Sequence, residues 1–230
     1  MKRLRRLFDY ALDLAFPGPL SGRSGPLRQQ ILDLEMTKRD SKLGRLFELE
    51  EQAPARSAWV GLGTIAYEIV SHFKPKRIVE LGSFGGFSTF AMALALRDLG
   101  QGGKIYAVDT WEGDDNTGPY GEVVYQNFLR TRRELGLEET VCPLRMTFKE
   151  ASTRIEPGVH LLHVDGLHTF RAVSDDFKCF RHHLMPGAIV LFHDVYTGFP
   201  QMRIFWALIS RRFPSYRIPY SHGLGVLQIH

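Results

Sequence analysis

Short apolar runs alternate with longer amphipathic stretches along this chain from residue 59 to the C-terminus. The short runs, rich in valine, isoleucine and leucine, predict strands at residues 78–80, 104–109, 141–145, 159–165 and 188–194, and a closing pair of strands within 216–230. The amphipathic stretches predict helices over residues 59–73, 91–99, 123–135, 171–183 and 201–212. This alternation predicts an α/β fold, a doubly wound, mostly parallel seven-stranded sheet with helices on both faces.

The N-terminal quarter of the chain follows a different pattern. Residues 2–16 repeat apolar side chains at helical spacing with basic residues opposite them, which predicts a short amphipathic helix. Residues 16–26 are dense in Pro, Gly and Ser and predict a linker or mobile loop. We therefore expect an N-terminal helical extension and linker over residues 1–55 and a second domain over 56–230. The helix could pack on that domain, form a dimer contact or make a peripheral membrane contact, and packing is favoured.

The composition is that of an ordinary globular protein, with 230 residues, 44% hydrophobic and 23% charged. No apolar run approaches membrane-spanning length, and Asp9 and Asp13 interrupt the N-terminal stretch, which lacks a signal-peptide cleavage site. These features favour a cytoplasmic protein. Cys142 and Cys179 follow no C-x-x-C spacing, so buried thiols are the favoured interpretation, with a disulfide between them left open.

The formal net charge of +4 would suit a nucleic-acid partner. However, the basic residues are dispersed apart from two clusters, within residues 2–6 and 130–133. Such runs are usually solvated helix faces. We therefore expect no stable nucleic-acid partner, and binding to nucleic acid or membrane remains the minority hypothesis.

A glycine-rich stretch, ELGSFGGFST at residues 80–89, joins the first predicted strand to the next helix. Free N–H groups and the positive dipole end at a helix N-terminus attract an anionic or strongly accepting ligand, and glycines let it approach the backbone. A dinucleotide loop requires G-x-G-x-x-G, but here Phe84 replaces the middle glycine and Glu80 precedes the turn, which suits a ligand carrying a cation. A glycine turn that only lets a helix pack on the sheet is the alternative.

The order of residues in this loop resembles the first motif of class I methyltransferases that use S-adenosyl-L-methionine (SAM), particularly the small-molecule O-methyltransferases related to catechol O-methyltransferase. SAM suits a loop preceded by an acid because it carries an amino group and a sulfonium but no phosphate. The resemblance implies a Rossmann-like methyltransferase fold for residues 56–230, with SAM as cofactor.

Acidic residues end four of the predicted strands: Glu80, Asp109, Asp165 and Asp194, the last preceded by His193. The carboxyl ends of parallel strands share one edge of the sheet, and buried carboxylates are costly unless they bind something. A single acid could be a helix cap, but four favour a ligand site. Asp109 is placed to accept hydrogen bonds from ribose hydroxyls, which SAM and NAD both carry. Trp111 could border the cofactor or be a half-buried loop residue.

Two blocks combine acids with histidines: HVDGLHTF at residues 163–170 and MPGAIVLFHDV at residues 185–195. Methyl transfer to a hydroxyl requires an acceptor in line with the S–CH3 bond and removal of its proton. Asp165 and Asp194 could bind a divalent cation, Mg2+ first of all, with His193 or water completing the ligand set. His168 could act as general base near neutral pH, or be a structural histidine bonded to one of these acids.

The paired blocks resemble those of bacterial metal-assisted O-methyltransferases that modify sugars, such as macrocin O-methyltransferase and cephalosporin-hydroxylase-like relatives, over residues 59–230. The resemblance implies cofactor contacts from Glu80, Gly82, Ser83, Gly86, Ser88, Asp109, Thr110, Trp111, Thr147, Phe148 and Asp165, metal ligands at Asp165, His193 and Asp194, and catalytic roles for Asp165 and His168. His193 stands where these relatives commonly carry an acid. The site could therefore bind Mg2+ weakly, prefer a metal that accepts imidazole, or work without metal.

We therefore expect a SAM-dependent O-methyltransferase that acts on a hydroxyl of a sugar, a glycoside or a similar polyhydroxylated small molecule, as a homo-oligomer. An NAD-dependent oxidoreductase is the first alternative, although its loop would require the missing glycine. A methyltransferase for phenols or nucleic acids is the second, but HVDG lacks the proline typical of enzymes that methylate base amines. A non-catalytic module of the same fold is the third, and the acidic edge argues against it. The sequence does not define the acceptor.

Overall fold

The computed structural model describes residues 26–27, 29–31, 58–59, 61–114, 117–196 and 198–230. The amphipathic helix predicted at residues 2–16, and nearly all of the linker predicted at 16–26, lie outside these residues. Leu27 and Ile31 are buried among the core residues of the second domain. Part of the N-terminal extension therefore contributes to the core.

Besides the helical residues 26–27 and 29–31, the described part of the chain forms six helices and two sheets. The helices are α4 (Gly63–Phe73), α5 (Phe87–Leu99), α6 (Gly121–Glu134), α7 (Phe148–Arg154), α8 (Phe170–Arg181) and α9 (Pro200–Ile209). The main sheet comprises β1 (Arg77–Leu81), β2 (Lys104–Asp109), β5 (Val141–Arg145), β6 (Val159–Val164), β7 (Leu184–His193), β8 (Ser215–Ile218) and β9 (Leu224–Gln228). A short antiparallel pair, β3 (Gly113–Asp114) and β4 (Gly118–Pro119), forms the second sheet.

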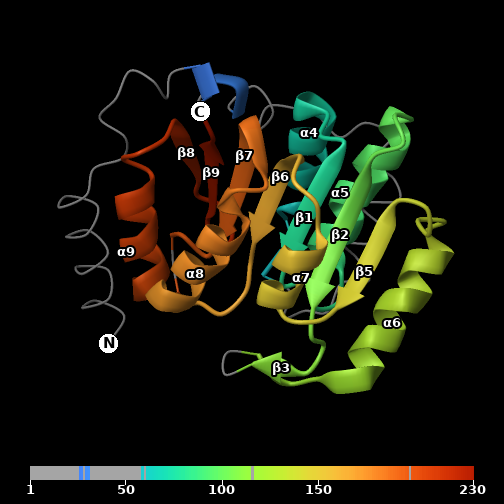
Figure 1. Cartoon of the computed structure of the whole chain (residues 1–230). Coiled ribbons are helices and arrows are strands. Elements are labelled where there is room, and N and C mark those ends of the chain that lie inside the picture. Colours follow the sequence, from blue (N-terminus) through green and yellow to red (C-terminus); the bar gives the residue numbers. More distant parts are fainter. Residues whose placement is uncertain (1–25, 28, 32–57, 60, 115–116, 197) are drawn as a thin grey trace.

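The seven strands follow the order β5-β2-β1-β6-β7-β9-β8 (Figure 1). The first five strands are parallel, and β9 is antiparallel to both β7 and β8. This arrangement confirms the doubly wound, mostly parallel seven-stranded sheet. The chain proceeds outward from β1 through β2 to β5 and then returns to β6 on the other side of β1. Ligands of such sheets bind beyond the carboxyl ends of the strands at this switch point.

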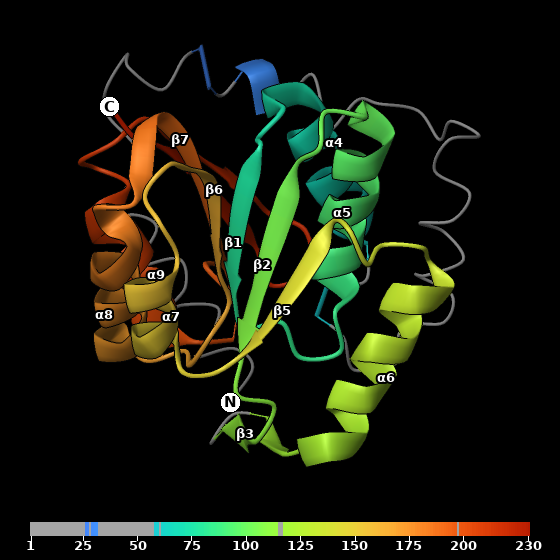
Figure 2. The same ribbon diagram turned by 45° about the vertical axis from the view of Figure 1, so that its right-hand side comes forward.

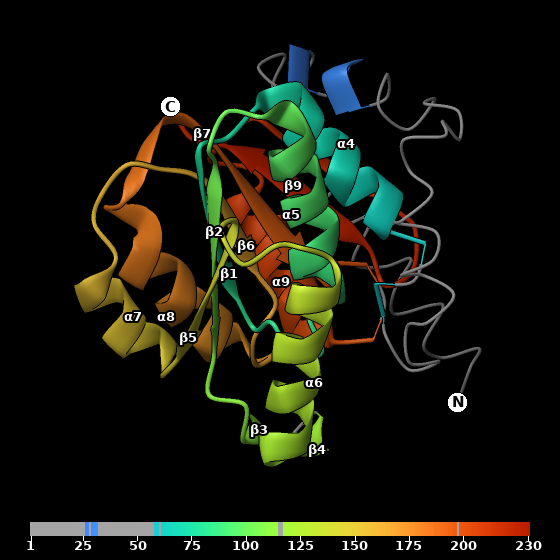
Figure 3. The ribbon, with the colours of Figure 1, turned by 90° about the vertical axis from the view of Figure 1, so that its right-hand side faces the viewer.

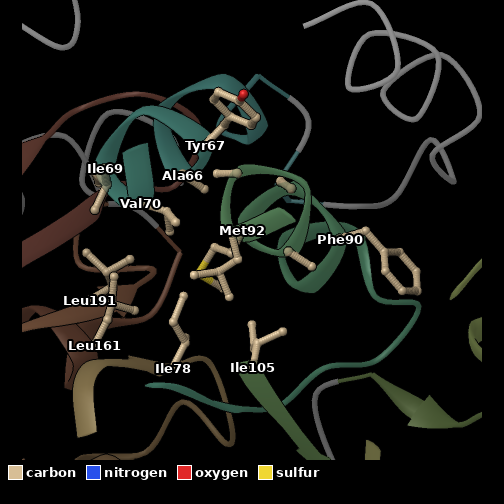
Figure 4. Packing of buried hydrophobic residues seen from close by; sticks show 14 of the residues in the cluster. Ala66, Tyr67, Ile69, Val70, Ile78, Phe90, Met92, Ile105, Leu161 and Leu191 are labelled. Carbon is tan, nitrogen blue, oxygen red and sulfur yellow. The ribbon is translucent and has the colours of Figure 1, made fainter. Parts of the chain in front are cut away.

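Helices cover both faces of the sheet. Figure 2 shows α4 and α5 behind β1 and β2, and Figure 3, which views the sheet along its edge, places α7 and α8 on the opposite side from α4, α5 and α6. One core cluster joins the sheet to α4 and α5, and the other joins it to α7, α8 and α9. In the first cluster, Met92 of α5 lies between the strand residues Ile78 and Ile105 and the α4 residue Val70 (Figure 4). The strands are buried on both faces, as their continuous apolar runs require.

Several element boundaries differ from the sequence predictions. The first helix begins at Gly63, so Trp59 lies in the turn before it. Strand β7 begins at Leu184, four residues before the predicted start, and includes Pro186 and Gly187. Pro143 lies in β5, which is an edge strand, where a missing N–H donor is tolerated.

Helix α7 was not predicted, although the sequence carries its start signal. The Thr147 hydroxyl accepts the N–H of Glu150, and the Glu150 carboxylate accepts the N–H of Thr147. This reciprocal pair is a capping box, the T-x-x-E pattern at a helix N-terminus. Both cysteines are free in the structure, so Cys142 and Cys179 are thiols. None of the described helices is long and apolar enough to cross a membrane.

Candidate active site

The acidic strand ends predicted from the sequence meet at one edge of the sheet. The N–H of Asp165, just after β6, donates to the carbonyl of Leu81 at the end of β1. The N–H of Gly82 in turn donates to the carbonyl of Val108 in β2. These hydrogen bonds join the glycine-rich loop to the strand ends that carry Asp109 and Asp165.

Glu80 is fully buried at the end of β1 and holds the glycine-rich loop in place. Its Oε1 accepts the Ser88 hydroxyl at 2.6 Å and lies 3.0 Å from Nδ1 of His163, which is its register partner in β6. Its Oε2 accepts the hydroxyls of Ser83, at 3.0 Å, and Thr89. Such a set of donors satisfies a buried carboxylate. Both Glu80 and Ser88 are buried, and their hydrogen bond supports the loop, while their contacts with a cofactor stay a prediction.

Some glycines of this loop are required by the packing of the fold, and another leaves room for a ligand. A Cβ on Gly82, which has φ +92°, would lie 2.1 Å from the backbone oxygen of Asp165. A Cβ on Gly86, with φ +87°, would lie 2.5 Å from the Phe90 ring. Gly85 is exposed, and a Cβ there would meet nothing within 4 Å. The fold itself therefore requires Gly82 and Gly86, whereas Gly85 offers its backbone to a ligand.

Asp109 ends β2 and fixes two strained loop residues. Its Oδ2 accepts the N–H of Phe84 at 2.8 Å, and its Oδ1 accepts the N–H of Trp111 at 2.7 Å. Both donors have positive φ, 43° and 55°, a conformation that residues other than glycine rarely adopt. The hydroxyl of Tyr120 also contacts both carboxylate oxygens. The Asp109 carboxylate thereby joins the glycine-rich loop to the segment after β2.

Trp111 is fully buried in the core, against Tyr125 and Phe128 of α6. Its indole N–H donates to the carbonyl of Phe84 at 2.8 Å. None of its surface is exposed, and a contact of Trp111 with the cofactor stays a prediction. The buried indole therefore supports the glycine-rich loop through this hydrogen bond.

The remaining predicted cofactor contacts lie around the same edge. The carbonyl of Thr110 accepts from Arg145 of β5, and Thr147 caps α7. Phe148 packs on Gly166, where an added Cβ would lie 2.6 Å from the Phe148 ring. Phe148 and Gly166 therefore form a wall beside Asp165.

Asp165, His168 and Asp194 bring a ligand atom each to within 4.8 Å of one another. Nε2 of His168 lies 2.6 Å from Oδ2 of Asp194 and 3.4 Å from Oδ1 of Asp165. Nδ1 of the buried His193 lies 3.2 Å from Asp194 and 3.4 Å from Asp165. His168 is part of this cluster, and His193, the predicted ligand, lies beside the same two carboxylates. Nε2 of His193 is buried and has no hydrogen-bond partner among the described residues.

The charges of this cluster compensate one another. Burial disfavours the carboxylate of Asp165, but the charge of His193 and hydrogen bonds from both histidines hold its pKa well below the usual value. Burial likewise opposes ionisation of Asp194, yet hydrogen bonds from His168 and His193 lower its pKa to about 2.

The two histidines respond in the opposite sense. Burial disfavours their protonated forms, but the two aspartates outweigh it and raise the pKa of His168 to about 9 and that of His193 to about 10. The aspartates therefore shift the pKa of His168 upward from the intrinsic value on which the sequence argument for a general base rested. His168 is cationic at pH 7 as long as no bound cation compensates the charge of the aspartates.

Three residues outside the predicted catalytic, cofactor-binding and metal-binding set hold this cluster. Trp59 donates its indole N–H to Oδ2 of Asp165 at 2.7 Å and stacks on His193, with ring centroids 5.0 Å apart. His222, in the turn between β8 and β9, has Nδ1 2.9 Å from Oδ1 of Asp194. Phe199 stacks on His168 with centroids 4.1 Å apart. The sequence could have indicated the position of His222. This residue lies just before β9, and a strand that pairs antiparallel with β7 must start beside the end of β7.

A family model described as a methyltransferase domain matches residues 79–195. The chain belongs to this methyltransferase family. The match runs from β1 to the residue after Asp194, so it contains the glycine-rich loop and the whole Asp165, His168 and Asp194 cluster. Trp59 and His222 lie outside the matched segment.

Two curated relatives are similar to parts of this chain. The uncharacterized protein y4gI of Sinorhizobium fredii is 40% identical over 177 residues, which are 74% of this chain and 19% of that protein. A caffeoyl-CoA O-methyltransferase of Stellaria longipes is 36% identical over 92 residues, 38% of this chain and 36% of that protein. The chain thus spans only a minor part of the length of these two relatives.

A solved structure shares the fold. The SAH-bound methyltransferase PaMTH1 of Podospora anserina superimposes with a TM-score of 0.65 at 15% identity, over 91% of this chain and 97% of that chain. This likeness confirms the class I, Rossmann-like methyltransferase fold expected from the sequence.

Proposed function

We propose that this chain is a SAM-dependent O-methyltransferase that acts on a hydroxyl of a small molecule with the help of a divalent cation. One observation carries the proposal: the glycine-rich loop at Gly82 packs directly on the backbone of Asp165, whose side chain belongs to the cluster with His168 and Asp194. A cofactor on the loop and a hydroxyl at the cluster would therefore be neighbours, as in-line transfer requires. Membership of the methyltransferase family and the related O-methyltransferase support the proposal.

The residues around the loop fit SAM. Gly85 leaves open space over an exposed backbone beside the N-terminus of α5. Asp109 lies at the end of β2, where an acid can bind ribose hydroxyls. Phe148, which follows β5, and Gly166, which follows β6, pack together and provide an apolar wall beside Asp165. Glu80, Ser88 and Trp111 keep the loop in the conformation that the ligand would need.

The cluster fits a divalent cation held by the carboxylates of Asp165 and Asp194, with water or the acceptor hydroxyl completing its ligand set. Such a cation, when bound, would orient the acceptor hydroxyl and lower its pKa. Carboxylate and water oxygens suit Mg2+ and Mn2+, so this donor set fits either ion. Trp59 and His222 each satisfy one further carboxylate oxygen, so the aspartates keep their orientation.

His168 is proposed as the general base. Its proton is held by the negative charge of Asp165 and Asp194, and compensation of that charge by a cation would release it. The neutral imidazole can then accept the hydroxyl proton as the methyl group moves from sulfur to oxygen. Phe199 fixes the imidazole plane by stacking on it. His193, buried beneath the aspartates, would retain its own proton and limit their repulsion.

A sugar or similar polyhydroxylated molecule is the proposed acceptor. Phe199 beside His168 and the exposed ring of Tyr220 in the neighbouring turn give apolar faces on which a sugar ring could stack. A phenol is the second candidate, favoured by the identity with the caffeoyl-CoA O-methyltransferase.

Two measurements on one set of variants test the metal and the base. Calorimetric titration of Mn2+, Zn2+ and Mg2+ into chelator-treated protein should show binding that is lost in Asp165→Asn and Asp194→Asn and kept in Asp175→Asn, an exposed acid of α8. Transfer of a labelled methyl group from SAM to a panel of glycosides and phenols should fall at least a hundredfold in Asp165→Asn and His168→Asn. Normal turnover in Asp165→Asn would disprove the proposed metal site, and transfer to phenols alone would replace the sugar by the second candidate.

A further inference from the structure

Tyr120 contacts the carboxylate that the proposed function assigns to the ribose of the cofactor. The residue directly precedes α6, and Figures 1 and 2 show this end of α6, with β3, beyond the C-terminal end of β2. Its hydroxyl lies 3.1 Å from Oδ1 and 3.2 Å from Oδ2 of Asp109. Its ring meets the Phe84 ring edge-on, with centroids 4.8 Å apart.

The Asp109 carboxylate leaves little room for another donor. The N–H groups of Phe84 and Trp111 already occupy one position on each oxygen, and the Tyr120 hydroxyl is shared between the positions that remain. Only 6% of Asp109 is exposed. A ribose that binds Asp109 must therefore take the place of the Tyr120 hydroxyl.

The two hydroxyls of a ribose match these positions better than one phenol does. A vicinal diol provides two O–H donors, one for each carboxylate oxygen, whereas a phenol provides a single proton for both. The phenol remains a donor throughout, because burial and the charge of Asp109 raise the pKa of Tyr120 well above its usual value. The exchange is therefore favourable for a nucleoside but carries the cost of releasing Tyr120.

We propose that Tyr120 stands in for the two ribose hydroxyls on Asp109 and is displaced when the cofactor binds. The proposal rests on the proposed function, since it requires a ligand with a ribose at Asp109. Tyr120 then competes with the cofactor, and the measured affinity is reduced by the fraction of molecules in which the hydroxyl occupies Asp109. While no cofactor is bound, the same contact keeps Asp109 and the glycine-rich loop in their binding arrangement.

The test is calorimetric titration of S-adenosylhomocysteine into the full chain and two matched variants. Tyr120→Phe keeps the ring against Phe84 and removes the competing hydroxyl, so binding should become about tenfold tighter. Tyr125→Phe removes a hydroxyl from a neighbouring tyrosine of α6 that packs on Trp111, and should change affinity less than twofold.

A second measurement follows Tyr120 directly and does not depend on a variant's stability. In protein labelled with 13C at the tyrosine ring carbon that bears oxygen, the Tyr120 resonance should shift when S-adenosylhomocysteine is added, and the Tyr125 resonance should shift much less. Equal or weaker binding by Tyr120→Phe, or an unchanged Tyr120 resonance in protein that binds the ligand, contradicts this inference alone. A wild-type chain that binds no S-adenosylhomocysteine contradicts the proposed function, and this inference with it.

Discussion

Trp59 donates its indole N–H to Oδ2 of Asp165 over 2.7 Å, 106 positions apart in the sequence. The same ring stacks on His193 and meets the edge of the His163 ring, which in turn contacts Glu80. Trp59 thus lies between the network under the glycine-rich loop and the cluster of aspartates and histidines. The turn that carries it is also held by the hydroxyl of Ser221, which donates to the carbonyl of Ala58.

Trp59→Phe should separate cofactor binding from turnover. The variant keeps an aromatic ring against His193 but leaves Oδ2 of Asp165 without its donor, so the carboxylate loses its fixed orientation. We expect kcat to fall about tenfold, because the variant loses a hydrogen bond to a charged group. The Kd for SAM should change less than threefold. Trp206→Phe, in the core contact of α9, serves as control and should leave kcat unchanged. Equal kcat in Trp59→Phe and wild type would show that Trp59 only packs.

Gly82→Ala should destabilise the protein, whereas Gly85→Ala should leave its stability nearly unchanged. The new methyl group at residue 82 would overlap the backbone oxygen of Asp165, at a φ that alanine avoids, so the free energy of unfolding should fall by about 3 kcal/mol or more. At residue 85 the methyl group meets open space, and stability should change by less than about 0.5 kcal/mol. Gly85→Ala should instead weaken SAM binding, because the methyl group covers the exposed backbone. Urea unfolding and calorimetry measure the two effects, and equal destabilisation by both variants would contradict the packing role of Gly82.

Stability should depend on pH through Asp176 of α8, which is not one of the proposed metal ligands. Burial, reinforced by the charge of Asp175, raises the pKa of Asp176 from 3.8 to about 7. The folded state therefore binds this proton more tightly than the unfolded state, and the group lowers stability as pH rises from about 4 to 7. Asp176→Asn removes the penalty, so it should raise the free energy of unfolding by about 1–3 kcal/mol at pH 8 and have little effect at pH 4. A gain that is the same at both pH values would show that ionisation of Asp176 is not its cause.

Much of the fold followed from the sequence because the strands are buried on both faces. Their continuous apolar runs, such as that of β7, separated clearly from the amphipathic helices, and the acids at their ends could be placed on one edge from topology alone. Boundaries were less exact where a turn signal lay inside an element. The Pro186 and Gly187 pair, read as a turn before β7, lies within it.

The sequence predicted where the site lies but not which contacts each of its residues makes. The sequence placed Glu80 and Asp109 on the same edge, but it could not show that four side chains would surround and bury Glu80 while Tyr120 would cover Asp109. Those contacts come from residues up to 83 positions away and depend on packing. The position of His168 in the cluster with the two aspartates has the same origin, because it depends on how the segment after β6 folds back toward Asp194.

The measurement that tests the central claim most directly is calorimetric titration of SAM into the wild-type chain and into Asp109→Asn. The account predicts saturable binding of SAM by the wild type, no binding of NADH, and a Kd for SAM at least tenfold higher in Asp109→Asn, with Asp175→Asn unchanged. No heat of binding with SAM, or equal affinity in wild type and Asp109→Asn, would contradict the claim that the ends of β1, β2, β6 and β7 form one methyl-transfer site.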